Sequence, residues 1–152
     1  MISLRTLHEF SPRTVFWYVA RHLLRQNEKA LDYRETQTSV CVYRAPDGKQ
    51  CAVGCLIADD EYDPGMEQLS VTALITYING KYAGKKPLMQ PIEDDVVRVL
   101  DRLQDLHDGT LPANWPEELL YVAQQSRIPL TDDERRAILT RNLDHEAFVQ
   151  LP

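Results

Sequence analysis

The chain of 152 residues lacks the signatures of the best-known enzyme and membrane-protein classes. It contains no Walker A, GxGxxG, GxSxG or HExxH motif, so the familiar nucleotide-binding and hydrolase chemistries have no support in the sequence. No segment approaches the roughly 20 consecutive apolar residues of a membrane-spanning helix. The first residues lack the apolar region of a signal peptide. We therefore expect a cytoplasmic protein that has no membrane partner.

Cysteine and positive charge are both scarce. The three cysteines are an odd number for a disulfide framework, so free thiols are expected in a reducing compartment. Lysine and arginine number 17 against 23 acidic residues, which gives a net charge of −6. This balance argues against a nucleic-acid partner bound through its phosphates, and it suits a partner with a basic surface.

Apolar residues make up 43% of the chain and recur mostly at helical spacing. The segment 69–79 fits both a helix and a strand, and Ser70 as a cap with Gly80 as a stop favours the helix. The sequence therefore predicts one mainly helical α+β domain over residues 1–152, with its core at about 11–143 and a loosely attached tail at 144–152. Helix-start signals lie at Ser11 with Pro12, at Pro91, at Pro116, and at Thr131 with Glu134.

A small β-hairpin is predicted around the turn sequence at 46–48, Pro-Asp-Gly. Residues 40–43 before the turn are strand formers. Residues 49–57 after it are small or apolar on both faces, which fits a strand buried on both sides. The alternative is a helix that starts near Lys49, in which Gly54 would cost about 1 kcal/mol relative to alanine.

Two of the thiols, Cys51 and Cys55, are predicted to be small packing residues. In a strand they would lie ~13 Å apart at 3.3 Å per residue, too far to hold one ion. In a helix they would be neighbours, but their spacing is not a usual zinc motif and the chain offers no second half for one. We expect no metal and no cofactor.

A thiol-based catalytic site is nevertheless one hypothesis for the chemistry of the chain. His107 falls in the last turn of a predicted helix, at the edge of its apolar stripe, and Asp108 follows it. Together with Cys51 they would make a Cys-His-Asp arrangement for a hydrolase or transferase. The alternative is structural, because a helix C-terminus favours a histidine and free cysteines often behave as small apolar residues.

Arg44 is the candidate for binding a small anionic ligand, with Tyr43 and Tyr62 as neighbours. A guanidinium can hold a phosphate or a carboxylate through two parallel hydrogen bonds. The alternative is a structural ion pair with Asp47 or with the acidic loop at 59–63. That loop lacks the spacing of a calcium-binding EF-hand and is expected to be solvated.

The stretch CVYRAPDGKQCAVGCLIADDEYDPGME at 41–67, followed by LQDLHD at 103–108 and a tryptophan, forms a distinctive pattern. It resembles a family of small, uncharacterised proteins encoded by tailed phages and their bacterial hosts, over roughly residues 11–128. Gln50 departs from the family pattern, which has lysine there. The residues that carry the resemblance are Cys41, Tyr43, Arg44, Gly48, Cys51, Ala52, Gly54, Leu56, Ile57, Tyr62, Leu103, Gln104, His107 and Asp108.

What the resemblance implies is provenance more than activity. Small accessory proteins of phages often bind host proteins, including those of defence systems, so a host protein is the expected partner. Three hypotheses therefore stand: binding of a host protein, cysteine-dependent catalysis, and capture of a small anion through Arg44. The oligomeric state is left open by the sequence.

Overall fold

The computed structural model describes residues 2–33 and 38–151. Its elements confirm a mainly helical α+β domain with one small antiparallel pair of strands. The helices are α1 (Pro12–Gln26), α2 (Val71–Lys81), α3 (Asp94–Gly109), α4 (Trp115–Gln125), α5 (Asp132–Thr140) and α6 (Glu146–Val149). The strands are β1 (Leu31–Tyr33) and β2 (Ser39–Cys41), and the 3₁₀ segments are η1 (Leu4–Glu9), η2 (Gly54–Leu56), η3 (Pro64–Met66) and η4 (Pro112–Asn114).

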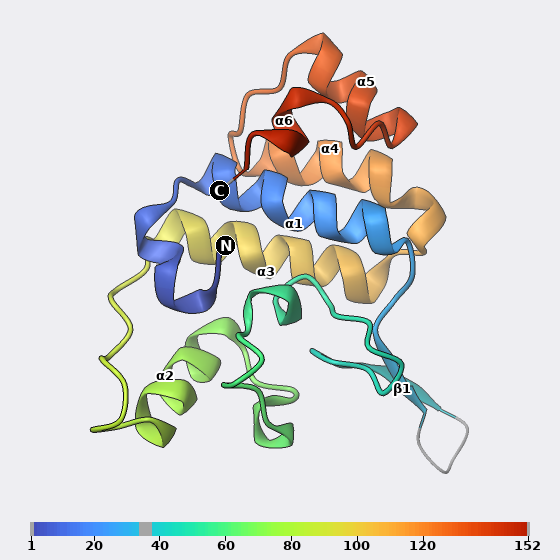
Figure 1. Cartoon of the computed structure of the whole chain (residues 1–152). Helices are drawn as coiled ribbons and strands as arrows, with labels where there is room; N and C mark the ends of the chain where they lie inside the picture. The colour runs from blue at the N-terminus through green and yellow to red at the C-terminus, as the bar shows by residue number, and fades with distance from the viewer. Residues whose placement is uncertain (1, 34–37, 152) are drawn as a thin grey trace.

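Helices α1, α3 and α4 lie side by side and form the centre of the molecule (Figure 1). Helices α5 and α6 cover one side of this layer, while α2, the strand pair and the segment that contains η2 and η3 lie on the other. The core is built where the apolar stripes of the central helices meet. Its fully buried side chains include Phe16, Val19 and Leu23 of α1, Leu100 and Leu103 of α3, and Trp115 and Leu119 of α4.

Most helix starts follow the signals of the sequence, but α3 begins at Asp94 and not at Pro91, because Glu93 before it is still extended. The Ser11 hydroxyl accepts the Thr14 N–H at the start of α1, and Ser70 does the same for Ala73 at the start of α2. At α5, Thr131 and Glu134 form the predicted capping box. The segment 69–79 is thus a helix, as its cap favours.

The predicted hairpin is present only as its turn. Gly48 has φ +88°, and Arg44 and Gln50 make a single antiparallel bridge across the turn. The partner of β2 is the upstream strand β1, with Leu31 opposite Cys41. This pairing is missed by the sequence analysis because strands of three residues leave almost no periodic signal.

The predicted second strand at 49–57 is wrong, and so is the alternative helix. After Cys51 the chain makes a tight turn into η2, where its N–H groups bond to carbonyls three or four residues back. Gly54 lies against the backbone of Tyr43, and a Cβ there would stand only 2.8 Å from the Tyr43 carbonyl carbon. The segment is buried as expected, but it pairs its backbone internally because the described chain supplies no further strand beside it.

The core reaches further toward both ends of the chain than 11–143. Ile2, Leu4 and Leu7 are fully buried in the N-terminal segment. In the C-terminal segment, which the sequence analysis expects to attach loosely, Phe148 is fully buried and its ring meets Trp17 edge-on at 4.8 Å. Both segments therefore complete the core, because each carries large apolar side chains that are buried in it.

Among residues 2–33 and 38–151, no helix combines the length and the apolar character that a membrane crossing requires.

Candidate functional site

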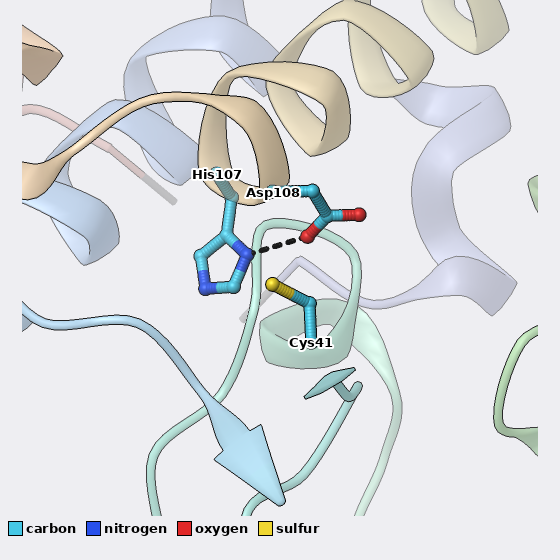
Figure 2. Close-up of side chains that lie close together, drawn as sticks. All are labelled: Cys41, His107 and Asp108. Atoms are coloured by element: carbon cyan, nitrogen blue, oxygen red, sulfur yellow. Dashed lines mark hydrogen bonds and ion pairs between the residues drawn. The ribbon is translucent and has the colours of Figure 1, made fainter. Parts of the chain in front are cut away.

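The structure brings Cys41, His107 and Asp108 together at the end of α3 (Figure 2). Their sulfur, nitrogen and oxygen atoms all lie within 4.8 Å of one another. Cys41 ends strand β2, and its thiol points at the last turn of α3, which carries the other two residues. The histidine and the acid are those expected from the sequence, whereas the thiol beside them is that of Cys41 and not Cys51.

The apolar stripe of α3 sets the position of His107. Leu100 and Leu103 precede it on the same face and are fully buried, and the imidazole itself has no exposed surface. Its ring lies 5.7 Å from the ring of Trp115. His107 is therefore a core residue placed by helical periodicity, with Asp108 beside it at the protein surface.

Both ring nitrogens of His107 are engaged. The Ala30 backbone N–H can only donate, and it lies 3.1 Å from Nε2, so Nε2 acts as the acceptor. A neutral imidazole then carries its proton on Nδ1, which donates to Asp108 Oδ1 at 2.8 Å. Neither nitrogen is left to take a proton from a thiol.

Asp108 accepts most of the hydrogen bonds in this cluster. Its Oδ1 also accepts from Gln104 Nε2 at 2.9 Å, and its backbone carbonyl accepts from Lys29 Nζ at 2.6 Å. Burial works to raise the pKa of Asp108, but the hydrogen bonds from His107, Gln104 and Cys41 outweigh it and lower that pKa. The carboxylate therefore stays ionised and joins the end of α3 to Cys41 of β2, while the backbone carbonyl of the same residue holds Lys29.

The Cys41 thiol is deactivated in this setting. Burial raises its pKa to about 11, and the charge and hydrogen bonding of the Asp108 carboxylate add to the shift. Reactive thiols need the opposite surroundings, with a cation or a free base that stabilises the thiolate. Cys41 is thus a protonated thiol facing an anion.

The predicted nucleophile Cys51 lies in a different environment. It is fully buried, its sulfur accepts the Gly54 N–H at 3.2 Å, and burial raises its pKa to about 12. In the described part of the chain it makes no hydrogen bond to His107. The neighbouring Cys55 donates to the Ala52 carbonyl, and burial raises its pKa as well. Both thiols act as small packing residues.

A metal ion would need the donor atoms that these hydrogen bonds already use. Within residues 2–33 and 38–151, Cys41, His107 and Asp108 are the one set of three potential ligands close enough to share an ion. Coordination by His107 would break its bond to Ala30 or to Asp108, and coordination by Cys41 would require loss of a proton held by its raised pKa. The cluster is built as a hydrogen-bonded anchor.

Gln104 extends the anchor toward the segment that contains η2. Its side-chain oxygen accepts the Val53 N–H at 3.2 Å while its amide nitrogen serves Asp108. Residues 41, 43, 54, 104, 107 and 108 of the sequence pattern at 41–67 and 103–108 therefore contribute to one continuous packed region. Cys41 and Gln104 belong to that pattern, which is the one signal in the sequence that could have assigned them to this region.

Arg44 is held by the acidic loop. Its Nη1 lies 2.7 Å from Asp59 Oδ1, its Nη2 donates to the Ile57 carbonyl at 2.5 Å, and its guanidinium lies 5.0 Å from the centre of the Tyr62 ring. This is the structural alternative for Arg44, with the loop rather than Asp47 as its partner. An anion at this position would compete with Asp59.

Glu67 organises the predicted ligand residues, although sequence reasoning did not single it out. It accepts the N–H groups of Tyr43 at 2.7 Å and Arg44 at 3.3 Å, and the Tyr62 hydroxyl at 2.8 Å. Burial and the bond to Glu67 raise the pKa of Tyr62 to about 12. Arg44 and Tyr62 line a cavity of about 500 Å³, but their side chains face the carboxylates of Asp59 and Glu67. Tyr43 does not line this cavity, and its hydroxyl donates to the Leu69 carbonyl.

The acidic loop at 59–63 is solvated at Asp59 and Asp60, as expected from the sequence, but it is also anchored to the rest of the protein. Glu61 is fully buried and pairs with Arg5 and Lys86, and Asp60 pairs with Lys86. These cations come from segments far apart in the sequence, so no local pattern could reveal the pairs. The loop holds the N-terminal segment against the connection between α2 and α3.

A shallow groove lies between α3 and α4. It encloses about 280 Å³, and Leu106 and Val122 line its apolar part beside the half-exposed ring of Tyr121. Asp105 and Glu118 line its acidic part, and neither makes an ion pair within the described residues. The groove therefore offers an apolar surface next to uncompensated negative charge.

Comparisons with protein-family models, with curated proteins and with solved structures returned no match for this chain.

Proposed function

We propose that the chain is a phage-type accessory protein that acts by binding a host protein, with counter-defence as the role that such binding would serve. The observation that supports it best is the α3–α4 groove, which combines an apolar surface with carboxylates that have no partner in the described chain. Interfaces commonly have an apolar centre and a polar rim.

Charge indicates what kind of partner surface fits. On α3, burial and the charge of Asp105 raise the pKa of Asp101, so a second carboxylate adds to the negative charge beside the groove. The one cation that lines the groove, Arg102, donates to the Ser126 hydroxyl at 3.1 Å. A partner segment that presents a lysine or arginine beside an apolar side chain would satisfy both halves of the groove.

The cysteine-dependent alternative has less support from the geometry. His107 has no free nitrogen, and the pKa values of Cys41 and Cys51 are raised to about 11 and about 12. The features that activate a thiol are thus replaced by features that keep it protonated.

The test is affinity capture from a lysate of the bacterial host, with the wild-type chain and two charge-reversal variants as baits. The groove variant is Asp105→Lys with Glu118→Lys. The matched control is Asp144→Lys with Glu146→Lys, which makes the same change in net charge at exposed positions near α6. We expect a stoichiometric partner that the wild type and the control retain at low salt.

The groove variant should retain that partner at least about tenfold less well, because like charges would then face the basic segment. High salt should weaken the wild-type complex, since exposed charges are screened. Equal capture by both variants, or no partner for the wild type, would overturn the proposal.

A further inference from the structure

A second hollow of about 540 Å³ lies where the start of α1, the face of α3 and the end of α4 meet. We refer to it as the arginine cavity. Its lining holds four arginines against a single carboxylate, although the chain as a whole carries a net charge of −6. The residues that matter for the argument are Arg13, Arg98, Arg102, Arg127, Asp95 and Ser126.

Two of the four guanidiniums are neutralised. Arg13 pairs with Glu134 and also donates to the Pro129 carbonyl. Arg98 pairs with Asp95 at 2.7 Å. The other two are not, and among the described residues Arg102 has only the neutral Ser126 hydroxyl as a hydrogen-bond partner.

Arg127 makes no side-chain hydrogen bond and no ion pair within residues 2–33 and 38–151. A matched residue in the same chain shows what a structural arginine does in this position. Both Arg127 and Arg141 follow a helix in the left-handed conformation, with φ of 55° and 53°. The guanidinium of Arg141 bonds to Asn27 and to the Pro112 carbonyl. Arg127 lines the cavity instead.

Ser126 completes a set of donors. Its oxygen accepts from Arg102, which leaves the hydroxyl proton free to donate to a further acceptor. Two guanidiniums that make no ion pair within the described residues, together with a hydroxyl, match the oxygens of a phosphate, which accepts several charge-assisted hydrogen bonds.

The cavity is larger than a phosphate ion alone would require. Small-molecule sites enclose roughly 300–1,000 Å³, and the buried Ile128 with Pro129 gives this one an apolar wall. We propose that the arginine cavity binds a phosphate group, either as inorganic phosphate or as the monoester of a small molecule, through Arg102, Arg127 and Ser126. This site is separate from Arg44 and does not depend on a protein partner.

Isothermal titration calorimetry of the full chain tests the site at neutral pH and physiological ionic strength. The probes are inorganic phosphate, adenosine 5′-monophosphate and adenosine. We expect both phosphates to bind and adenosine not to bind. Tighter binding of the monophosphate would identify a phosphorylated small molecule as the source, and equal binding would identify the free anion.

Arg127→Gln and Arg102→Gln should each weaken phosphate binding by about tenfold or more, because each removes a charge-assisted hydrogen bond. Arg135→Gln is the matched control, an exposed arginine on α5 outside the cavity, and it should leave the affinity within about twofold. Arg127 is exposed, so its variant is expected to fold normally.

Three results would overturn the proposal: no heat with either phosphate, unchanged affinity in both glutamine variants, or adenosine binding as well as its monophosphate. Binding of a single-stranded oligonucleotide without binding of either small phosphate would also overturn it, because the site would then serve a nucleic acid.

Discussion

His107 and Arg127 lie at comparable places, one in the last turn of α3 and the other just past the end of α4, yet their side chains are in opposite situations. His107 is fully buried and has both nitrogens bonded. Arg127 is exposed at a cavity and has neither a hydrogen bond nor an ion pair in the described part of the chain. The first is chemically the more versatile residue, and the second is the one available to a ligand.

The comparison shows that residue type and position do not decide whether a side chain can act. A donor or acceptor that is already satisfied inside the fold must lose a bond before it can serve a substrate. The polar groups around Asp108 and Gly54 are hydrogen-bonded almost throughout, whereas the arginine cavity holds two arginines that make no ion pair within the described residues. The following experiments test this difference from the packed side.

Removing the imidazole should have the largest effect. His107→Ala would leave the buried Ala30 N–H without an acceptor, take one donor from Asp108 and open a void beside Trp115. We expect a loss of about 4 kcal/mol in the free energy of unfolding, measured by urea denaturation. His8→Ala, at a partly exposed position, should stay within about 0.5 kcal/mol. Equal stability of the two variants would mean that His107 is not an anchor.

The reactivity of Cys41 measures the protonation of the cluster directly. With a pKa of about 11 the thiolate fraction near pH 8 is small, so alkylation should be about two orders of magnitude slower than in the urea-unfolded chain. The rate should rise with pH up to about 11. Trypsin cuts at Arg44 and Lys49, so mass spectrometry can follow Cys41 separately from the other two thiols. Alkylation faster than that of an unfolded thiol would show an activated nucleophile.

A single methyl group should also disturb the packed side. Gly54→Ala places a Cβ against the Tyr43 carbonyl group, so the backbone must shift, at a cost of about 2 kcal/mol or more in folding free energy. Gly80→Ala is the control. It lies inside α2 with no atom near the added methyl and should stabilise the chain by about 0.5–1 kcal/mol. A neutral Gly54→Ala would show that the region is loosely packed.

How much of the fold and of the site can be predicted depends on the distance along the sequence over which each signal acts. Capping by Ser11, Ser70 and Thr131 acts within four residues, and the helices it predicts are confirmed. The burial of His107 could be anticipated in the same way, from the stripe of α3. The choice between Cys41 and Cys51 as its neighbour depends on the pairing of β1 with β2, which only the tertiary structure determines.

The arginine cavity, in contrast, could not be predicted from local signals in the sequence. Its arginines come from three elements, and positions 13 and 127 are separated by most of the chain. Nothing in the spacing of Arg98, Arg102 or Arg127 distinguishes them from ordinary surface residues. Whether these arginines can bind an anion depends on which carboxylates lie near them. Helix packing, and not a motif, determines this.

The bond between Ala30 and His107 also bears on how the chain folds. It joins residues 77 positions apart, so its formation must close a long loop whose entropy opposes early contact. Helices α1 and α3 can pack through their apolar stripes before this bond exists. We therefore expect the strand pair to dock late, with His107 mutations speeding unfolding more than they slow folding. The last turn of α3 would then act as the latch that closes after the helical layer has assembled.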